Sequence, residues 1–206
     1  MLELFGRANS INVRKVLWLG DELGLAFDHH GADGTPLDRA ELLALNPNGL
    51  VPVLRDEGRV LWESNTICRY LAAREHRTDM LPAEPAVRAR VEQWMDWQAT
   101  ELNDAWRYVL MAKLRHSPAH ADPAAIAASE LAWNHCMGIL ERQLRTVGGR
   151  FALGDTFTVA DIVLGLSVHR WFAVPIERPV LPAVSDYYAV LSERPAFLRH
   201  GRNGLP

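Results

Sequence analysis

The stretch that most constrains the fold is a β-hairpin pattern that contains a proline and leads directly into a helix. Two short apolar runs, residues 51–54 and 59–62, flank a D-E-G turn signal at 56–58, and this spacing is typical of a hairpin. Pro52 has no N–H group to donate to a strand ladder, so it belongs on an edge or at the start of a strand. The backbone of Val51 is then free to pair with an extended ligand, as a sheet edge captures a peptide.

The helix expected after the hairpin offers groups for both charges of an amino acid. Its apolar pattern starts near Ile67, and Ser64 is the expected N-cap. The free N–H groups of a first helical turn suit a carboxylate, and Glu63 suits an ammonium group. In the alternative interpretation, Ser64 only caps the helix, Glu63 is solvated and Pro52 blunts a sheet edge. The residues alone leave both interpretations open.

Composition excludes several classes of protein. With 206 residues, 49% of them hydrophobic, the chain can build one large domain or two small ones. A net charge of −3 without a Lys/Arg-rich run argues against nucleic acid or an anionic membrane as a partner. The histidines have no metal-binding spacing, so we expect no metal site. Cys68 and Cys136 lie in apolar helical patterns and no secretion signal opens the chain, which favours a cytoplasmic protein with buried thiols.

The first part of the chain predicts a small mixed sheet. A strand at 2–5, a helix at 11–23 and a strand at 26–30 form a unit whose crossover is right-handed and whose strands are parallel. A polar loop and a short helix at 39–45 then lead to the hairpin. Together these segments predict a four-stranded sheet with helices on its faces.

The rest of the chain predicts only helices. Residues 74–85 carry charges and two prolines without an apolar period, so they are expected to form a linker. Thr158 and Asp161 form a capping box in sequence, which gives Asp161 a structural rather than a catalytic role. The helices are expected at 87–116, at 124–147, from Val159 onward, after Pro182 and around Pro195.

This layout and four motifs resemble the cytosolic glutathione transferases. The motifs are N-P-N-G-L-V-P-V-L at 46–54, E-S-N-T-I at 63–67, F-T-V-A-D-I at 157–162 and E-R-P-A-F at 193–197. The opening R-A-N-S-I-N-V-R-K-V is most similar to bacterial members, close to an enterobacterial type. The resemblance implies an α/β plus all-α fold. A thioredoxin-like, glutathione-binding domain would span 1–78, and an all-helical domain lining the electrophile pocket would span 86–206.

The same resemblance implies how glutathione would be held. Pro52 would be cis, Val51 would pair with the cysteinyl backbone, and Glu63 and Ser64 would bind the γ-glutamyl end with help from Asn65. The glycine carboxylate needs a cation, for which Arg39 is the candidate and a solvated arginine the alternative. Leu50 stands where several relatives have a polar residue, so one hydrogen bond to the tripeptide is expected to be missing. Relatives are usually two-fold dimers, so a homodimer is expected.

The chemistry implied is activation of the glutathione thiol, because the thiolate is the nucleophile. Lowering a thiol pKa by about two units requires about 2.7 kcal/mol, and one hydrogen bond to a charged group supplies about 1.5 to 3 kcal/mol. Ser10, where the first strand gives way to the first helix, is the expected donor, with Asn12 assisting and Asn9 as the alternative. A plain N-cap is the structural alternative for Ser10.

The electrophile would lie between the first helix and the long helix at 87–116. The candidate lining residues are Asn103, Trp106, Arg107 and Met111, although residues of these types are more often simply part of the core or the surface. The function implied is transfer of glutathione to small electrophiles in detoxification. The alternatives are a glutathione-dependent dehalogenase, isomerase or peroxidase, or a non-catalytic interaction module of the same fold.

Overall fold

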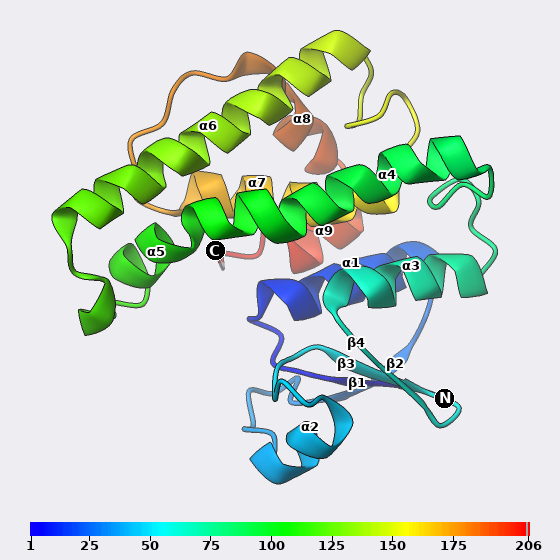
Figure 1. Ribbon diagram of the computed structural model, residues 1–206. Coiled ribbons are helices and arrows are strands. Elements are labelled where there is room, and N and C mark those ends of the chain that lie inside the picture. The colour runs from blue at the N-terminus through cyan, green and yellow to red at the C-terminus, as the bar shows by residue number, and fades with distance from the viewer. Residues whose placement is uncertain (205) are drawn as a thin grey trace.

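The computed structural model describes residues 1–204 and 206, and it begins with the predicted mixed sheet. Its strands are β1 (Leu2–Phe5), β2 (Phe27–His30), β3 (Val53–Asp56) and β4 (Arg59–Trp62), in the order β2-β1-β3-β4. The pair β1–β2 is parallel and the hairpin pair β3–β4 is antiparallel, as the sequence predicted, and β1 also pairs antiparallel with β3 (Figure 1).

Two helices, α1 (Ile11–Leu23) and α3 (Ser64–Arg74), cover one face of this sheet and separate it from the helical part that follows α3 (Figure 1). Leu4 and Leu54, register partners on β1 and β3, are fully buried in the same core as the apolar side chains of both helices. The short α2 (Arg39–Leu45) lies on the opposite side of the sheet. α1 therefore has one side against the sheet and the other toward the helical part.

The helical part is built around α7. From Val159 to Trp171 every residue of this helix is buried, and it packs against α1, α4 and α8. The helices of this part are α4 (Pro85–Trp97), α5 (Asn103–Lys113), α6 (Pro123–Val147), α7 (Val159–Ala173), α8 (Pro182–Leu191) and α9 (Pro195–His200), with a 3-10 turn at Pro118–His120. Among the described residues, no helix combines the length and the apolar character that crossing a membrane requires.

The predicted capping box at the start of α7 is present. The Asp161 carboxylate accepts hydrogen bonds from the backbone N–H of Thr158 at 2.8 Å and of Ala152 at 2.9 Å, and from the Tyr187 hydroxyl at 2.9 Å. Burial raises the pKa of Asp161, while these hydrogen bonds oppose that shift. The residue holds the loop before α7 in place, which agrees with its expected structural role.

Two predicted strand boundaries are wrong. β3 begins at Val53 rather than at residue 51, because Pro52 has no N–H group to donate and strand pairing starts only after it. β2 begins at Phe27, one residue later than predicted. The Val51–Pro52 peptide bond is cis, as the resemblance implied.

The predicted N-cap of α3 is also wrong. Ser64 is the first residue of the helix, and Glu63 occupies the N-cap position with φ 71°. The Ser64 hydroxyl does not cap the helix because it faces Asn12 and Lys15 of α1. A side chain expected to make a local contact thus makes a contact between helices.

The single helix predicted at 87–116 is wrong, because it is divided by a π-helical segment, Gln98–Leu102. A π-turn contains an extra residue per turn, which a search for the ordinary helical period does not reveal. The helix also starts earlier, at Pro85, where proline suits the first helical position and the Glu84 side chain caps the helix. It ends at Lys113, shortly before the left-handed His116 with φ 48°.

Candidate functional site

The starts of α1 and α3 lie beside each other and bring the predicted thiol and headgroup residues together. The Ser64 hydroxyl donates to the Asn12 side-chain oxygen over 3.3 Å. Ser10 is the N-cap residue of α1, yet its hydroxyl makes no capping bond and no other hydrogen bond with the described residues. This hydroxyl is therefore available to a ligand, which the plain N-cap interpretation did not anticipate.

The edge expected to receive the peptide backbone is formed at Val51. No hydrogen bond occupies the backbone N–H or carbonyl of Val51 within the part of the chain described. Gly6, at the end of β1, allows the close packing here. A Cβ atom at Gly6 would lie 2.4 Å from a Val13 methyl carbon and 3.1 Å from the Val51 Cβ. The half-buried Val51 thus lies directly beside the loop that leads to Ser10.

A cavity of about 290 Å³ continues from this edge. It is lined by Arg7, Pro36, Leu37, Leu42, Gly49, Leu50 and Val51. Arg39, the predicted partner of the glycine carboxylate, is exposed at the start of α2 and does not line this cavity. Sequence reasoning missed Arg7, although its place in the loop between the first strand and Ser10 could have indicated it.

Behind Ser64 lies a buried cation that sequence reasoning also missed. The Lys15 ammonium group donates to the side-chain oxygens of Gln98 at 2.8 Å and Asn65 at 3.1 Å, and lies 3.5 Å from the Ser64 hydroxyl. Asn65 in turn donates to the backbone carbonyl of Met95 at 2.7 Å. These contacts join α1, the start of α3 and the junction of α4 with the π-helical segment.

The charge of Lys15 is not neutralised by an ion pair with any described carboxylate. Burial lowers the pKa of Lys15 to about 8, and the more distant Glu63 carboxylate raises it slightly. The sequence signal for this buried cation was the spacing of Lys15, which lies four residues from both Ile11 and Leu19. Such a spacing puts the charged residue on the apolar side of a helix.

The four predicted electrophile-lining residues all lie on α5 and differ in burial and contacts. Asn103 accepts a hydrogen bond from the Gln98 side chain at 3.0 Å, and Arg107 is exposed and paired with Asp104 at 3.0 Å. Trp106 is buried, and Met111 is half-buried. A separate cavity of about 130 Å³ is lined by Asn9, Leu110, Leu114, Arg115, Arg170 and Pro206, and it includes none of the four.

Comparison with known proteins decides the family. Residues 9–74 match the family model described as glutathione S-transferase, N-terminal domain, and residues 123–190 match that of the C-terminal domain. The chain is 40% identical to the glutathione S-transferase GstB of Escherichia coli over 200 residues, 95% of each chain. The chain belongs to the glutathione S-transferase family. Its N-terminal sheet and helices are the thioredoxin-like part of the glutathione transferase fold, and its C-terminal helices are the all-α part.

Further relatives of this glutathione transferase agree. A theta class glutathione S-transferase from Xanthomonas axonopodis pv. citri, solved with glutathione bound, is 39% identical with a TM-score of 0.86, and the match covers 100% of this chain and 99% of that one. Glutathione S-transferase 3 of Zea mays is 32% identical over 95% of this chain and 91% of its own. These relatives confirm the predicted similarity to bacterial glutathione transferases, the enzyme class and glutathione as the co-substrate.

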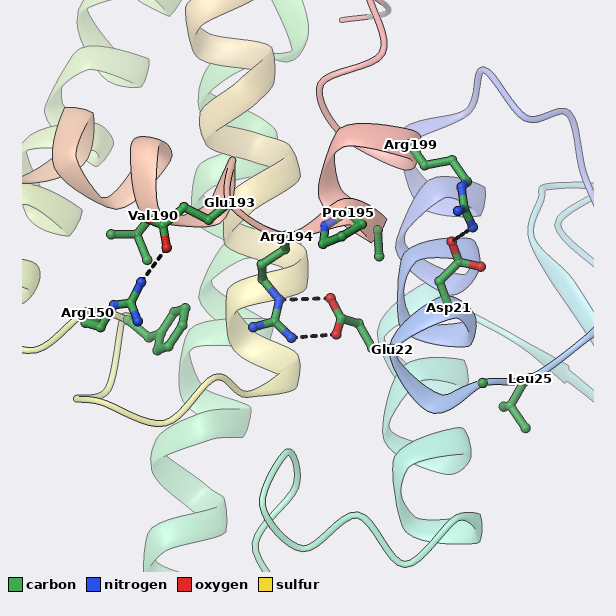
Figure 2. A pocket seen from close by; sticks show the side chains of 12 residues that line it. Asp21, Glu22, Leu25, Arg150, Val190, Glu193, Arg194, Pro195 and Arg199 are labelled. Atoms are coloured by element: carbon green, nitrogen blue, oxygen red, sulfur yellow. Dashed lines mark hydrogen bonds and ion pairs between the residues drawn. The ribbon is translucent and has the colours of Figure 1, made fainter.

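A wider cavity, about 570 Å³, lies at the other end of α1 (Figure 2). Its charged side chains are paired with one another: Arg194 with Glu22 at 2.5 Å, and Arg199 with Asp21 at 2.5 Å. None of the residues predicted to bind glutathione lines it. These ion pairs neutralise the charges in the cavity and join Arg194 and α9 to α1, at the end of α1 remote from Ser10.

A lysine titration tests the description of the buried cation. The sequence holds two lysines, Lys15 and Lys113, so protein labelled with nitrogen-15 lysine should give two ammonium signals. We expect one signal to titrate with a midpoint near pH 8, because burial disfavours the charged form. Lys15→Arg should remove that signal and assign it. Two midpoints near the ordinary value of about 10.4 would contradict the buried position of the ammonium group.

Proposed function

We propose that this glutathione transferase binds the tripeptide along Val51 and the start of α3, and aims its thiolate at a small electrophile. The observation that carries the proposal is that the starts of α1 and α3 meet. Ser64 of α3 is hydrogen-bonded to Asn12 of α1, and the unpaired Ser10 hydroxyl lies two residues before Asn12. An extended tripeptide paired with the free Val51 backbone would reach both Ser10 and the start of α3. Family membership supplies the reaction class, transfer of glutathione to an electrophilic centre.

The γ-glutamyl end is assigned to the start of α3. Its carboxylate would accept hydrogen bonds from first-turn N–H groups and from Ser64, and its ammonium group would lie near the exposed Glu63. Lys15 supports this assignment because it places a positive charge behind Ser64, on the side away from the ligand. Asn65 is assigned an indirect role, because its side chain accepts a hydrogen bond from Lys15 and donates one to the Met95 carbonyl.

The thiol end is assigned to Ser10, with Asn12 assisting and Asn9 as the alternative. A hydroxyl that donates to the thiolate stabilises the charged form, and the N-terminus of α1 adds about 0.3 to 1 kcal/mol. The thiolate sulfur then donates an electron pair to the electrophilic carbon. In a substitution the leaving group departs with its bonding pair, and in an addition the neighbouring carbon takes a proton. A dehalogenase or isomerase would use the same thiolate.

Replacement of Ser10 tests the activation step. Ser10→Ala should raise the pKa of the bound glutathione thiol by about one to two units and lower kcat/KM at neutral pH about ten- to hundredfold. The pH dependence of thiolate absorbance in the ultraviolet measures the shift. Ser185→Ala, at an exposed position of α8, is the matched control. An unchanged titration would transfer the role to Asn12 or Asn9.

The glycine end of glutathione is assigned to the cavity beside Val51, with Arg7 rather than Arg39 as the favoured cation. Arg7→Ala should weaken glutathione binding about fivefold, since an ion pair with an exposed arginine contributes up to about 1 kcal/mol. Glutathione esterified at its glycine carboxylate carries no charge at that end, so its affinity should be equal in both proteins. Calorimetry measures both affinities. A loss in Arg39→Ala instead would restore the assignment made from sequence.

The proposal includes a homodimer. Val60 and Trp62 of β4 are 36% and 37% exposed, and Val87 of α4 is 51% exposed, so both parts of the chain carry uncovered apolar side chains. Light scattering should give twice the chain mass of 23.1 kDa, and Trp62→Glu should shift the protein toward the monomer. Val180→Glu, at a position 90% exposed outside these elements, serves as the control. A monomer in the unmodified protein would refute this part of the proposal.

The remaining parts of the proposal concern organisation and cellular role. They are a glutathione-binding domain at 1–78, an electrophile-lining domain at 86–206, and detoxification in the cytoplasm. Retention of Glu63 and Ser64 counts against a non-catalytic module, because such a module has no need of a headgroup site. Turnover of glutathione with a panel of electrophiles separates these cases. Binding without turnover of any electrophile would favour the module.

A further inference from the structure

The side chains around the Lys15 ammonium group have a fixed hydrogen-bond polarity. An ammonium group donates hydrogens and accepts none, so each of its partners must present an oxygen atom to it. Gln98 does so at 2.8 Å and Asn65 at 3.1 Å, and the Ser64 hydroxyl oxygen lies 3.5 Å away. All four residues are buried, with exposed fractions between 1% and 7%. Solvent therefore offers these groups few alternative partners.

The remaining groups of the two amides agree with this polarity. With its oxygen toward Lys15, Asn65 donates its NH2 group to the Met95 carbonyl at 2.7 Å, and a carbonyl can only accept. Gln98 likewise donates to the Asn103 side-chain oxygen at 3.0 Å. Gln98 reaches Lys15 from the π-helical segment, a kind of turn that is frequent at functional sites. Turning either amide over would set a donor against the ammonium group, so the charge of Lys15 fixes both.

Ser64 is the member of this network that the proposed function assigns to the γ-glutamyl carboxylate. Because its oxygen accepts from Lys15, its hydrogen points away from Lys15, and it is donated to the Asn12 side-chain oxygen over 3.3 Å. A carboxylate needs donors, and a serine hydroxyl held in this way offers one. A neutral amine has a lone pair, so a deprotonated Lys15 can accept the Ser64 hydrogen and leave only oxygen lone pairs toward the ligand.

We propose that Lys15 is a positioning residue for glutathione: while protonated it obliges Ser64 to donate to the γ-glutamyl carboxylate, and loss of its proton weakens binding. This inference rests on the proposed function and adds a pH-sensitive switch to the same site. Lys15 touches neither the ligand nor the reacting sulfur, so it acts through Ser64. No covalent bond to carbon or sulfur changes in the switch, in which one proton passes from the ammonium group to solvent.

The pH range of the switch follows from the surroundings of Lys15. Burial is the largest cause of its pKa of about 8. Among the described residues, Cys68 and Glu63 raise that pKa and Arg170 of α7 lowers it, whereas no group on α4 or α9 contributes. An unfolded lysine titrates near 10.4, so the unfolded chain binds more protons above the pKa of Lys15 and folding becomes more favourable there. Titration of Lys15 therefore opposes unfolding in the range where affinity is lost.

Binding of S-methylglutathione to the unmodified protein tests the proposal, because this ligand keeps the γ-glutamyl end and has no thiol to titrate. Its dissociation constant should be constant below the pKa of Lys15 and rise about tenfold above it. By reciprocity, the Lys15 ammonium signal should titrate about one pH unit higher in the complex than in the free protein. Calorimetry across this pH range and spectra of protein labelled with nitrogen-15 lysine measure the two quantities.

Gln98→Glu provides a matched change of charge beside Lys15. The substitution keeps the shape of the side chain and sets a carboxylate against the ammonium group, so it should raise the pKa of Lys15 and move the loss of affinity upward by about one pH unit or more. Gln93→Glu, at an exposed position of α4, adds the same charge away from the network and should leave the affinity curve unchanged. The ammonium group of the ligand titrates alike in all three proteins, so their comparison isolates Lys15.

A lysine that only ties the helices together gives a different result. S-methylglutathione would then bind with one pH dependence in the unmodified protein and in Gln98→Glu, and the Lys15 signal would have one midpoint with and without the ligand. That outcome would overturn this inference alone. Failure of the unmodified protein to bind glutathione at any pH would overturn the proposed function and this inference with it.

Discussion

The interaction on which the site depends is the buried ammonium group of Lys15. Its acceptors on Asn65 and Gln98 belong to segments 50 and 83 residues away, and it fixes the start of α3 against α1. Removing one partner from such a network leaves the other polar groups buried without compensation, which typically costs several kcal/mol. The network therefore gives Ser64 a fixed position relative to Ser10, which a ligand that spans both residues requires.

Features with local signals could be predicted from the sequence, and contacts between distant segments could not. The bounds of α1 and α2, the strand β4 and the capping box at Thr158 follow from periodicity and from neighbouring residues. The role of Ser64 was mistaken because its partner is 52 residues away on another helix. The π-helical turn at Gln98 was missed because its effect, a side chain directed at Lys15, appears only in three dimensions.

Family motifs and physical reasoning therefore contributed different parts of the site. The motifs around Pro52 and Ser64 indicated the peptide edge and the headgroup, and the cis bond at Pro52 agrees with them. They did not indicate Arg7, which lies outside those motifs but lines the cavity next to Val51. A cation that serves a ligand can come from any segment that reaches the cavity, whereas the family pattern places it just before α2 and predicts Arg39.

The two ends of α1 differ in how their arginines are held, and this difference bears on how the thiol is activated. At its C-terminal end the carboxylates of Asp21 and Glu22 pair with arginines, whereas at its N-terminal end Arg14 and Arg170 both donate to the main-chain oxygen of Pro206. Positive charge that is not neutralised stabilises any nearby anion, and a thiolate is one. The contribution of the exposed Arg115 is screened by salt, but that of the buried Arg170 is screened much less. In the proposed mechanism the Ser10 hydroxyl acts directly on the thiolate, and positive charge at this end of α1 would add to that stabilisation.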